Sequence, residues 1–155
     1  MYKDLSRAAG AMKMSLQRIP VRIQMDTVIR DDDTMDQIKN SFKGTVATND
    51  RMTVITYREQ LEDDHYVDTL MTITDKKVNV KRSGAISMNQ SFIEQALTEC
   101  SYTHPHGNMH METFTTDASH TTSDLGGKVV LTYEVKLNGQ GARQHELELI
   151  YEKEE

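Results

Sequence analysis

Apolar and polar residues alternate one by one along most of this chain, and turn-forming residues interrupt the alternation about every ten residues. Successive side chains of a β-strand point to opposite faces, so this pattern predicts strands with one buried and one wet face. The clearest case lies near the end of the chain, around Asn138-Gly139, a pair that favours a tight hairpin turn. The expected buried residues on either side of it are Val129, Leu131, Tyr133, Val135, Leu137, Leu147, Leu149 and Tyr151.

The other strands follow from the same alternation. We expect them at residues 20–30, 35–48, 51–60, 65–74, 77–92, 94–104 and 107–117. The run over 77–92 continues through Ser83-Gly84, where a glycine inside a strand pattern indicates a bend or bulge. Helical turns are expected only within residues 2–16 or 93–99, which leaves no covering helices for a parallel sheet.

These strands predict an all-β fold: a single closed antiparallel up-and-down barrel of about 8–10 strands. The barrel domain is expected to span residues 17–155. Residues 1–16 precede the first convincing strand and are expected to form an N-terminal extension, either loose or a short helix. A chain of 155 residues has the usual size of one domain.

The net charge and the cysteine content limit which partners and which cellular compartment we expect. The net charge of −6 disfavours binding to nucleic acid, and no segment approaches the roughly 20 apolar residues that span a membrane. Cys100 is the single cysteine, as expected of a protein in a reducing compartment, and we therefore expect a cytoplasmic location. Cys100 itself is expected to be a buried, inert thiol.

Arg82 is the most informative polar residue. Its position in the alternation places it on the face of Val78, Val80 and Ile86, where a charge is costly unless it is paired or wet. In a barrel lumen, such an arginine could bind the carboxylate or phosphate of a ligand. Two other interpretations remain open: a salt bridge to an internal glutamate, or a bulge at Gly84 that turns Arg82 outward.

Five further residues complete the expected ligand site. They combine hydrogen-bonding side chains with an adaptable methionine, as small-molecule pockets commonly do. They are Gln90, Tyr57, Glu59, Met88 and Tyr133. Each of the tyrosines could equally be an ordinary strand residue whose hydroxyl reaches the rim.

The sequence contains few features that indicate metal binding or catalysis. His104, His106 and His110 flank one turn, but no cysteine or carboxylate is fixed beside them, so we assign no metal site. The chain lacks a Gly-x-Ser-x-Gly elbow, a phosphate-binding glycine loop and a His-Glu-x-x-His pair. We therefore expect no catalytic residues and no cofactor.

The segment Arg82-Ser83-Gly84-Ala85, followed by Met88-Asn89-Gln90 and Phe92, resembles the YwiB-like family of small bacterial proteins. The Tyr57-Arg58-Glu59, Ser123-Asp124-Leu125 and Ile150-Tyr151-Glu152 segments agree with it, and the resemblance covers about residues 17–153. It implies a domain of unknown function with a calycin (lipocalin-like) barrel, a fold whose interior often holds one small apolar molecule.

Three functions follow as hypotheses. The first is a non-enzymatic protein that binds a small, mostly apolar or amphiphilic molecule, with an anionic end near Arg82, in the barrel lumen. The second is a protein–protein module that forms a homodimer or docks through a barrel edge or through the N-terminal segment. The third is a small barrel enzyme, which would need a carboxylate or histidine with a perturbed pKa in the lumen.

Overall fold

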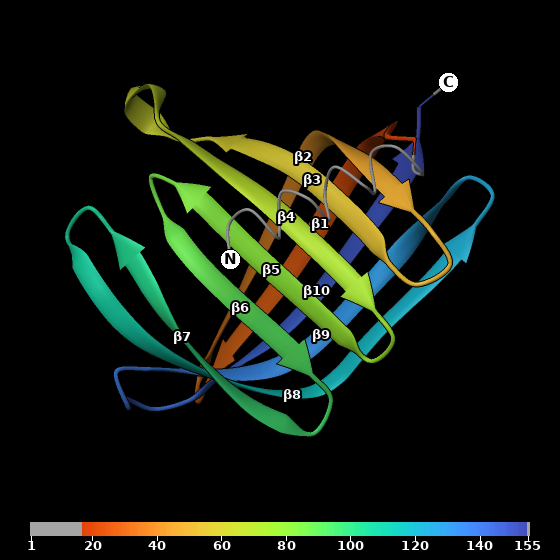
Figure 1. Cartoon of the computed structure of the whole chain (residues 1–155). Helices are drawn as coiled ribbons and strands as arrows, with labels where there is room; N and C mark the ends of the chain where they lie inside the picture. The colour runs from red at the N-terminus through yellow and green to blue at the C-terminus, as the bar shows by residue number, and fades with distance from the viewer. Residues whose placement is uncertain (1–16, 155) are drawn as a thin grey trace.

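The computed structural model describes residues 17–154, and the expected extension over residues 1–16 lies outside them. The described chain is an antiparallel meander that closes into one barrel, in the order β1-β10-β9-β8-β7-β6-β5-β4-β3-β2 (Figure 1). This arrangement confirms the predicted fold class. The strands are β1 (Ile19–Asp31), β2 (Thr34–Thr48), β3 (Thr53–Gln60), β4 (Tyr66–Thr74), β5 (Lys77–Gly84), β6 (Ser87–Ile93), β7 (Ala96–His104), β8 (Gly107–Ser123), β9 (Gly126–Leu137) and β10 (Arg143–Lys153).

Buried residues alternate with more exposed ones in several strands, as the sequence predicts, and β4 is the clearest case. In β4, Val67, Thr69, Met71 and Ile73 are buried, and the residues between them are exposed or half-buried. The turn between β9 and β10 has positive φ angles at Asn138 (53°) and Gly139 (72°), the conformation that an Asn-Gly turn favours.

Two predicted boundaries were wrong. The run over 77–92 is not one bent strand but two, because the chain reverses after Gly84 (φ 113°) and Arg82 pairs with Met88 in the next strand. Ile86 therefore lies in the turn. The polar residues after 117 also continue β8 to Ser123, beyond a register shift between Thr115 and Asp117. Residues 93–99, where a helical turn was expected, end β6 and begin β7.

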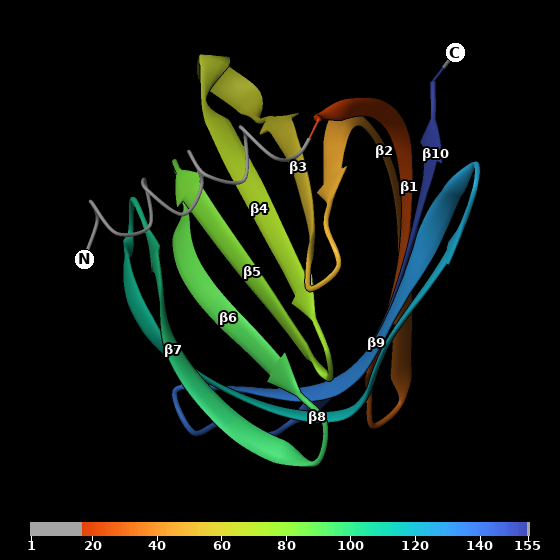
Figure 2. The same ribbon diagram turned by 45° about the vertical axis from the view of Figure 1, so that its right-hand side comes forward.

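The hairpin of β1 and β2 bends over one end of the barrel (Figures 1 and 2). Gly44 lies at the place where β2 joins β3, paired with Tyr57. A Cβ atom on Gly44 would collide with the backbone oxygen of Thr56 and crowd Ile23. Glycine is therefore required here by the close approach of two strands rather than by its φ angle. The parts of the hairpin on either side of this bend consequently lie on opposite walls of the barrel, while β1 and β2 stay paired (Figure 2).

The interior holds a buried apolar core, and a cavity lies at each end of the barrel. At the end near the β4–β5 turn, a fully buried cluster that includes Ile73, Val78 and Phe92 packs against Leu131 and Leu149. At the other end, near the β5–β6 turn, the ladder between β6 and β7 contains only the pairs of Ser87 and Met88 with Thr103 and Tyr102. These pairs lie at the same end as the cavity described next.

Candidate ligand-binding lumen

The cavity at the open end of the barrel has a volume of about 480 Å³. That size is typical of sites for small molecules. Its apolar wall comes from Met88 of β6, Met111 of β8, and Val135 and Leu137 of β9. Arg82, Gln90, Tyr102, Tyr133 and His145 add polar atoms to the wall. The lining therefore combines an apolar surface with a few hydrogen-bonding groups.

Arg82 lines the cavity, and its Nη2 also contacts Oε1 of Glu59 at 3.1 Å. Arg82 thus faces inward and forms the salt bridge to an internal glutamate that was one of the interpretations of the sequence, and it is not turned outward by a bulge at Gly84. The two side chains are 25% and 31% exposed, so the pair is shielded from bulk water without being dry. The contact uses one guanidinium nitrogen, and Arg82 has further N–H groups to offer.

Gln90 and Tyr133 are buried residues at the inner side of the cavity. Gln90 Nε2 donates a hydrogen bond of 2.8 Å to Oγ1 of Thr113 on β8, which fixes the amide against the wall. The Tyr133 ring packs edge-on against Phe92, at 4.6 Å between ring centroids, and burial raises the pKa of its hydroxyl. Tyr133 therefore stays a neutral phenol that can donate or accept a hydrogen bond.

Tyr57 and Glu59 occupy less direct positions. Tyr57 stacks on Phe42 at 4.5 Å between ring centroids, and burial raises its pKa, but it is not part of the cavity wall. Glu59 acts on the cavity through Arg82. Between Tyr57 and Arg82 in the sheet lies Thr69, whose buried hydroxyl has no hydrogen-bond partner among the described residues.

Sequence reasoning missed three polar residues at the rim of the cavity. His145 of β10 stacks on Tyr133 at 5.0 Å between ring centroids, and Arg143 Nε contacts Oδ2 of Asp31 at 3.6 Å. Burial, and then the charge of Arg143, lower the pKa of His145. His145 shares the alternation of Leu147, Leu149 and Tyr151, so its inward position could have been inferred from the sequence.

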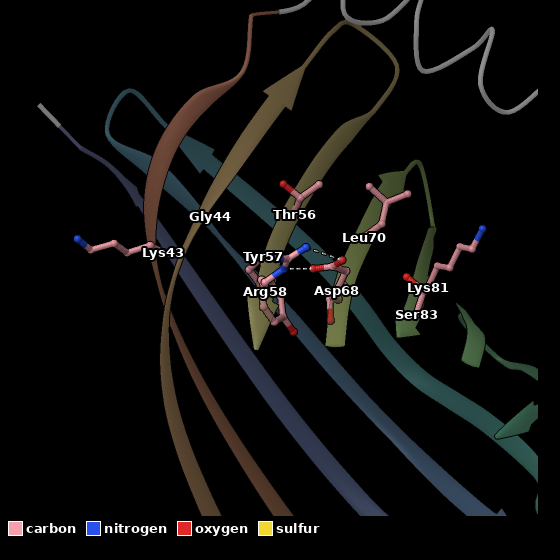
Figure 3. A pocket seen from close by; sticks show the side chains of 10 residues that line it. Lys43, Gly44, Thr56, Tyr57, Arg58, Asp68, Leu70, Lys81 and Ser83 are labelled. Carbon is pink, nitrogen blue, oxygen red and sulfur yellow. Dashed lines mark hydrogen bonds and ion pairs between the residues drawn. The ribbon is translucent and has the colours of Figure 1, made fainter. Parts of the chain in front are cut away.

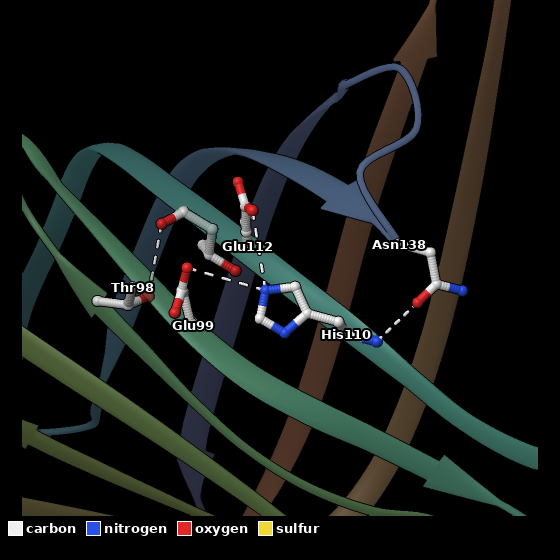
Figure 4. A network of polar contacts seen from close by, with 6 residues as sticks. Thr98, Glu99, His110, Glu112 and Asn138 are labelled. Carbon is white, nitrogen blue, oxygen red and sulfur yellow. Dashed lines mark hydrogen bonds and ion pairs between the residues drawn. The ribbon is translucent and has the colours of Figure 1, made fainter.

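The histidines near the β7–β8 turn do not converge. His104 Nδ1 accepts a hydrogen bond from the backbone N–H of His106 at 3.0 Å, whereas His110 lies on the outer face (Figure 4). There His110 Nε2 is 3.8 Å from a carboxylate oxygen of Glu99 and of Glu112. Their ligand atoms lie within 4.8 Å of one another, so these three could hold a divalent cation. The group is outside the lumen, and we assign it no role.

A shallow groove on the outer face crosses β2, β3, β4 and β5 (Figure 3). Arg58 spans it in a two-point contact with Asp68, at 2.7 and 3.2 Å, and its guanidinium lies 4.8 Å from the centre of the Tyr66 ring. Lys43 and Lys81 flank this pair. Arg58 and Asp68 are both more than half exposed, so the groove lacks the enclosure of the lumen.

Known proteins share this barrel. A family model with the description "Domain of unknown function (DUF1934)" matches residues 23–149. The chain belongs to this family. A relative from Bacillus subtilis (strain 168), the "Uncharacterized beta-barrel protein YwiB", is 25% identical over 136 residues, which are 88% of this chain and 95% of the relative.

The crystal structure of the YwiB protein from Bacillus subtilis superposes with a TM-score of 0.82 at 23% identity. The superposition covers 92% of this chain and 98% of that one. Family membership and barrel thus confirm the resemblance inferred from the sequence. Among the described residues, no helix has the length and apolar character needed to cross a membrane.

Proposed function

We propose that this DUF1934 protein binds a small, mostly apolar molecule with an anionic end in its lumen, and that it does so without catalysing a reaction. The observation that carries the proposal is the position of Arg82, on the wall of a cavity of about 480 Å³ whose mixed lining also includes two methionines, a valine and a leucine. Glu59 contacts only one nitrogen of this half-buried guanidinium, so a ligand anion would complete the hydrogen bonds of Arg82.

The apolar wall fits a flexible chain. Met88 and Met111 face the cavity from neighbouring parts of the barrel. Methionine is unbranched and polarizable, so it adapts to ligands of different shapes. Val135 and Leu137 extend this surface toward the rim, where Tyr102 adds an aromatic ring. The apolar part of the ligand would lie against these side chains, in the manner expected of calycin-like barrels.

The polar end of the ligand would meet Arg82. One of its nitrogens contacts Glu59, and the remaining N–H groups match the fork geometry of a carboxylate or phosphate. Arg143 lies at the rim and adds a second positive charge, balanced by Asp31. Gln90 and the Tyr133 hydroxyl supply neutral hydrogen bonds at the inner side. The two ion pairs balance in charge, so the preference for an anion rests on the guanidinium N–H groups that Glu59 leaves free.

His145 is the observation that favours an enzyme instead. It lines the cavity, and its lowered pKa leaves it neutral near pH 7, as a general base should be. However, its ring is stacked face to face on Tyr133, with 17° between the planes. No hydrogen bond joins its ring to another described residue, so nothing fixes a tautomer or aligns a nucleophile. Binding alone therefore accounts for the lumen better.

The test compares decanoate with decanol by isothermal titration calorimetry. We expect decanoate to bind more tightly than decanol, because only the carboxylate pairs with Arg82. The double variant Arg82→Gln/Glu59→Gln removes both charges without stranding either, and it should abolish this preference. Arg58→Gln, on the outer face, is the matched control and should preserve it. Absence of binding by both molecules would overturn the lumen proposal, and a preference that survives the double variant would overturn the role of Arg82.

A further inference from the structure

The first part of β2 has a strand on only one side. β2 pairs with β1 without interruption from Thr34 to Val46, but its ladder with β3 covers only Gly44 to Thr48. Residues 34–43 therefore form an open edge, unpaired by any other described strand. Figure 2 shows why: the hairpin of β1 and β2 bends away from β3 and runs down the opposite wall.

This open edge is long, regular and partly apolar. Residues 34–41 are all exposed, and Met35 and Ile38 are 61% and 46% exposed. Proteins usually protect such an edge with a proline, a bulge, a short strand or many charges. The open edge contains no proline, and its register with β1 shows no bulge. Its regular backbone is therefore available for another strand.

The backbone groups of the odd residues point out of this edge. Just beyond the last pair of the β2–β3 ladder, the N–H of Asn49 donates to the oxygen of Met52 at 3.0 Å. Hydrogen bonds in an antiparallel ladder alternate from one residue to the next, so the odd residues of β2 face the β3 side. The even residues consequently bond to β1. Along the open edge, the free groups belong to Met35, Gln37, Lys39, Ser41 and Lys43.

We propose that the open edge pairs antiparallel with the open edge of a second copy of this chain, about a two-fold axis at Ile38. Only registers that match odd with odd residues keep each face of the joined sheet continuous. In this register, Ile38 meets its own copy, and the opposed pairs are Gln37 with Lys39, Asp36 with Asn40, Met35 with Ser41, and Thr34 with Phe42.

The charges of the edge select this register over its neighbours. An axis at Lys39 would place the two lysines directly opposite, and an axis at Gln37 would oppose Asp36 to Ile38. Like charges in opposed positions destabilise a sheet, and so does an aspartate against an apolar side chain. With the axis at Ile38, no like charges are directly opposed. The pairing is self-complementary, as an interface of two identical surfaces must be.

Light scattering on the full chain from about 5 to 500 μM tests the pairing, since a single added ladder favours a modest affinity. We expect the mass to rise from that of the 17.7-kDa monomer towards twice that value. Lys39→Pro removes an N–H of the open edge but none that bonds to β1, so this variant should stay folded and monomeric. Asn40→Pro, its control, removes an N–H that bonds to β1 and should lower the melting temperature.

A second pair of variants keeps the test decisive if a proline prevents folding. Ile38→Lys brings two positive charges together on the axis and should leave only the monomer. Met35→Lys introduces the same charge at a more exposed side chain of the edge, one that faces Ser41 in the proposed register, and it should retain the dimer. A wild-type mass of one chain at every concentration would overturn the proposal. A dimer that persists in both Lys39→Pro and Ile38→Lys would overturn it as well, because the interface would then lie elsewhere.

Discussion

The guanidinium of Arg82 on β5 reaches past β4 to the carboxylate of Glu59 on β3, with 3.1 Å between Nη2 and Oε1. The contact joins two strands that are not neighbours in the sheet, on the inner face and at the mouth of the cavity. It balances the charge of an inward arginine and uses one of its guanidinium nitrogens.

Removal of Arg82 should lower the stability of the fold, because Glu59 then loses its partner. We expect Arg82→Met to lower the free energy of unfolding by about 1–3 kcal/mol, because Glu59 would be left partly buried and unpaired. Urea denaturation measures this loss. Arg58→Met removes an exposed ion pair and should cost less than about 1 kcal/mol. Equal losses in the two variants would contradict the special position of Arg82.

Gly44 should tolerate no side chain. A Cβ at this position would overlap the backbone oxygen of Thr56, so Gly44→Ala must push β2 away from β3. We expect a destabilisation of about 1–3 kcal/mol by thermal or chemical unfolding. Gly141→Ala is the control, since a Cβ there would have no atom within 4 Å and the φ of Gly141 is not positive. Wild-type stability of Gly44→Ala would show that the bend does not depend on this contact.

Acid should weaken the fold through His145. Burial lowers its pKa in the folded state below the ordinary value of 6.5, so the unfolded chain binds a proton more readily. The stability that neutral His145 contributes is thus present above pH 6.5 and is lost as the pH falls through its folded pKa. His145→Gln should flatten the dependence of the unfolding free energy on pH between about 7 and 5. An unchanged slope in His145→Gln would contradict this assignment.

A single tryptophan can report on the cavity, because the natural chain has none. Leu137 lies in the cavity wall, whereas Leu125 is 75% exposed on the outside. In Leu137→Trp, decanoate should shift the emission maximum and intensity, since the ligand replaces water next to the indole. In Leu125→Trp, the emission should not respond. A response of equal size at both positions would indicate non-specific association.

The sequence predicted most of the strands but not every turn and strand end. Alternation around Asn138-Gly139 predicts β9 and β10 almost residue by residue, because the buried face and the turn type both constrain the register. The hairpin at Gly84 was missed because Ala85 and Ile86, which follow it, are not typical turn residues. The end of β8 was missed because a register shift after Thr115 interrupts the alternation.

The candidate site, likewise, could be predicted only in part from the sequence. The inward direction of Arg82 follows from alternation along β5, and that of Gln90 from alternation along β6. Sequence alone can supply such alternation. The cavity and its set of lining strands do not follow from it, since side chains from β5 to β10 meet there only in the closed barrel. These features depend on contacts between distant segments. The approach of His145 to Tyr133, in contrast, follows from the register of the β9–β10 hairpin and could have been predicted.

The methionine methyl groups offer the most direct test of a ligand-binding lumen. Met88 and Met111 line the cavity, Met71 is buried among the other core residues, and Met35 is exposed on β2. In a titration with decanoate followed by methyl NMR, the resonances of Met88 and Met111 should shift together and saturate, while those of Met71 and Met35 stay in place. Unchanged Met88 and Met111 resonances at saturating decanoate, or the largest shift at Met35, would contradict the account.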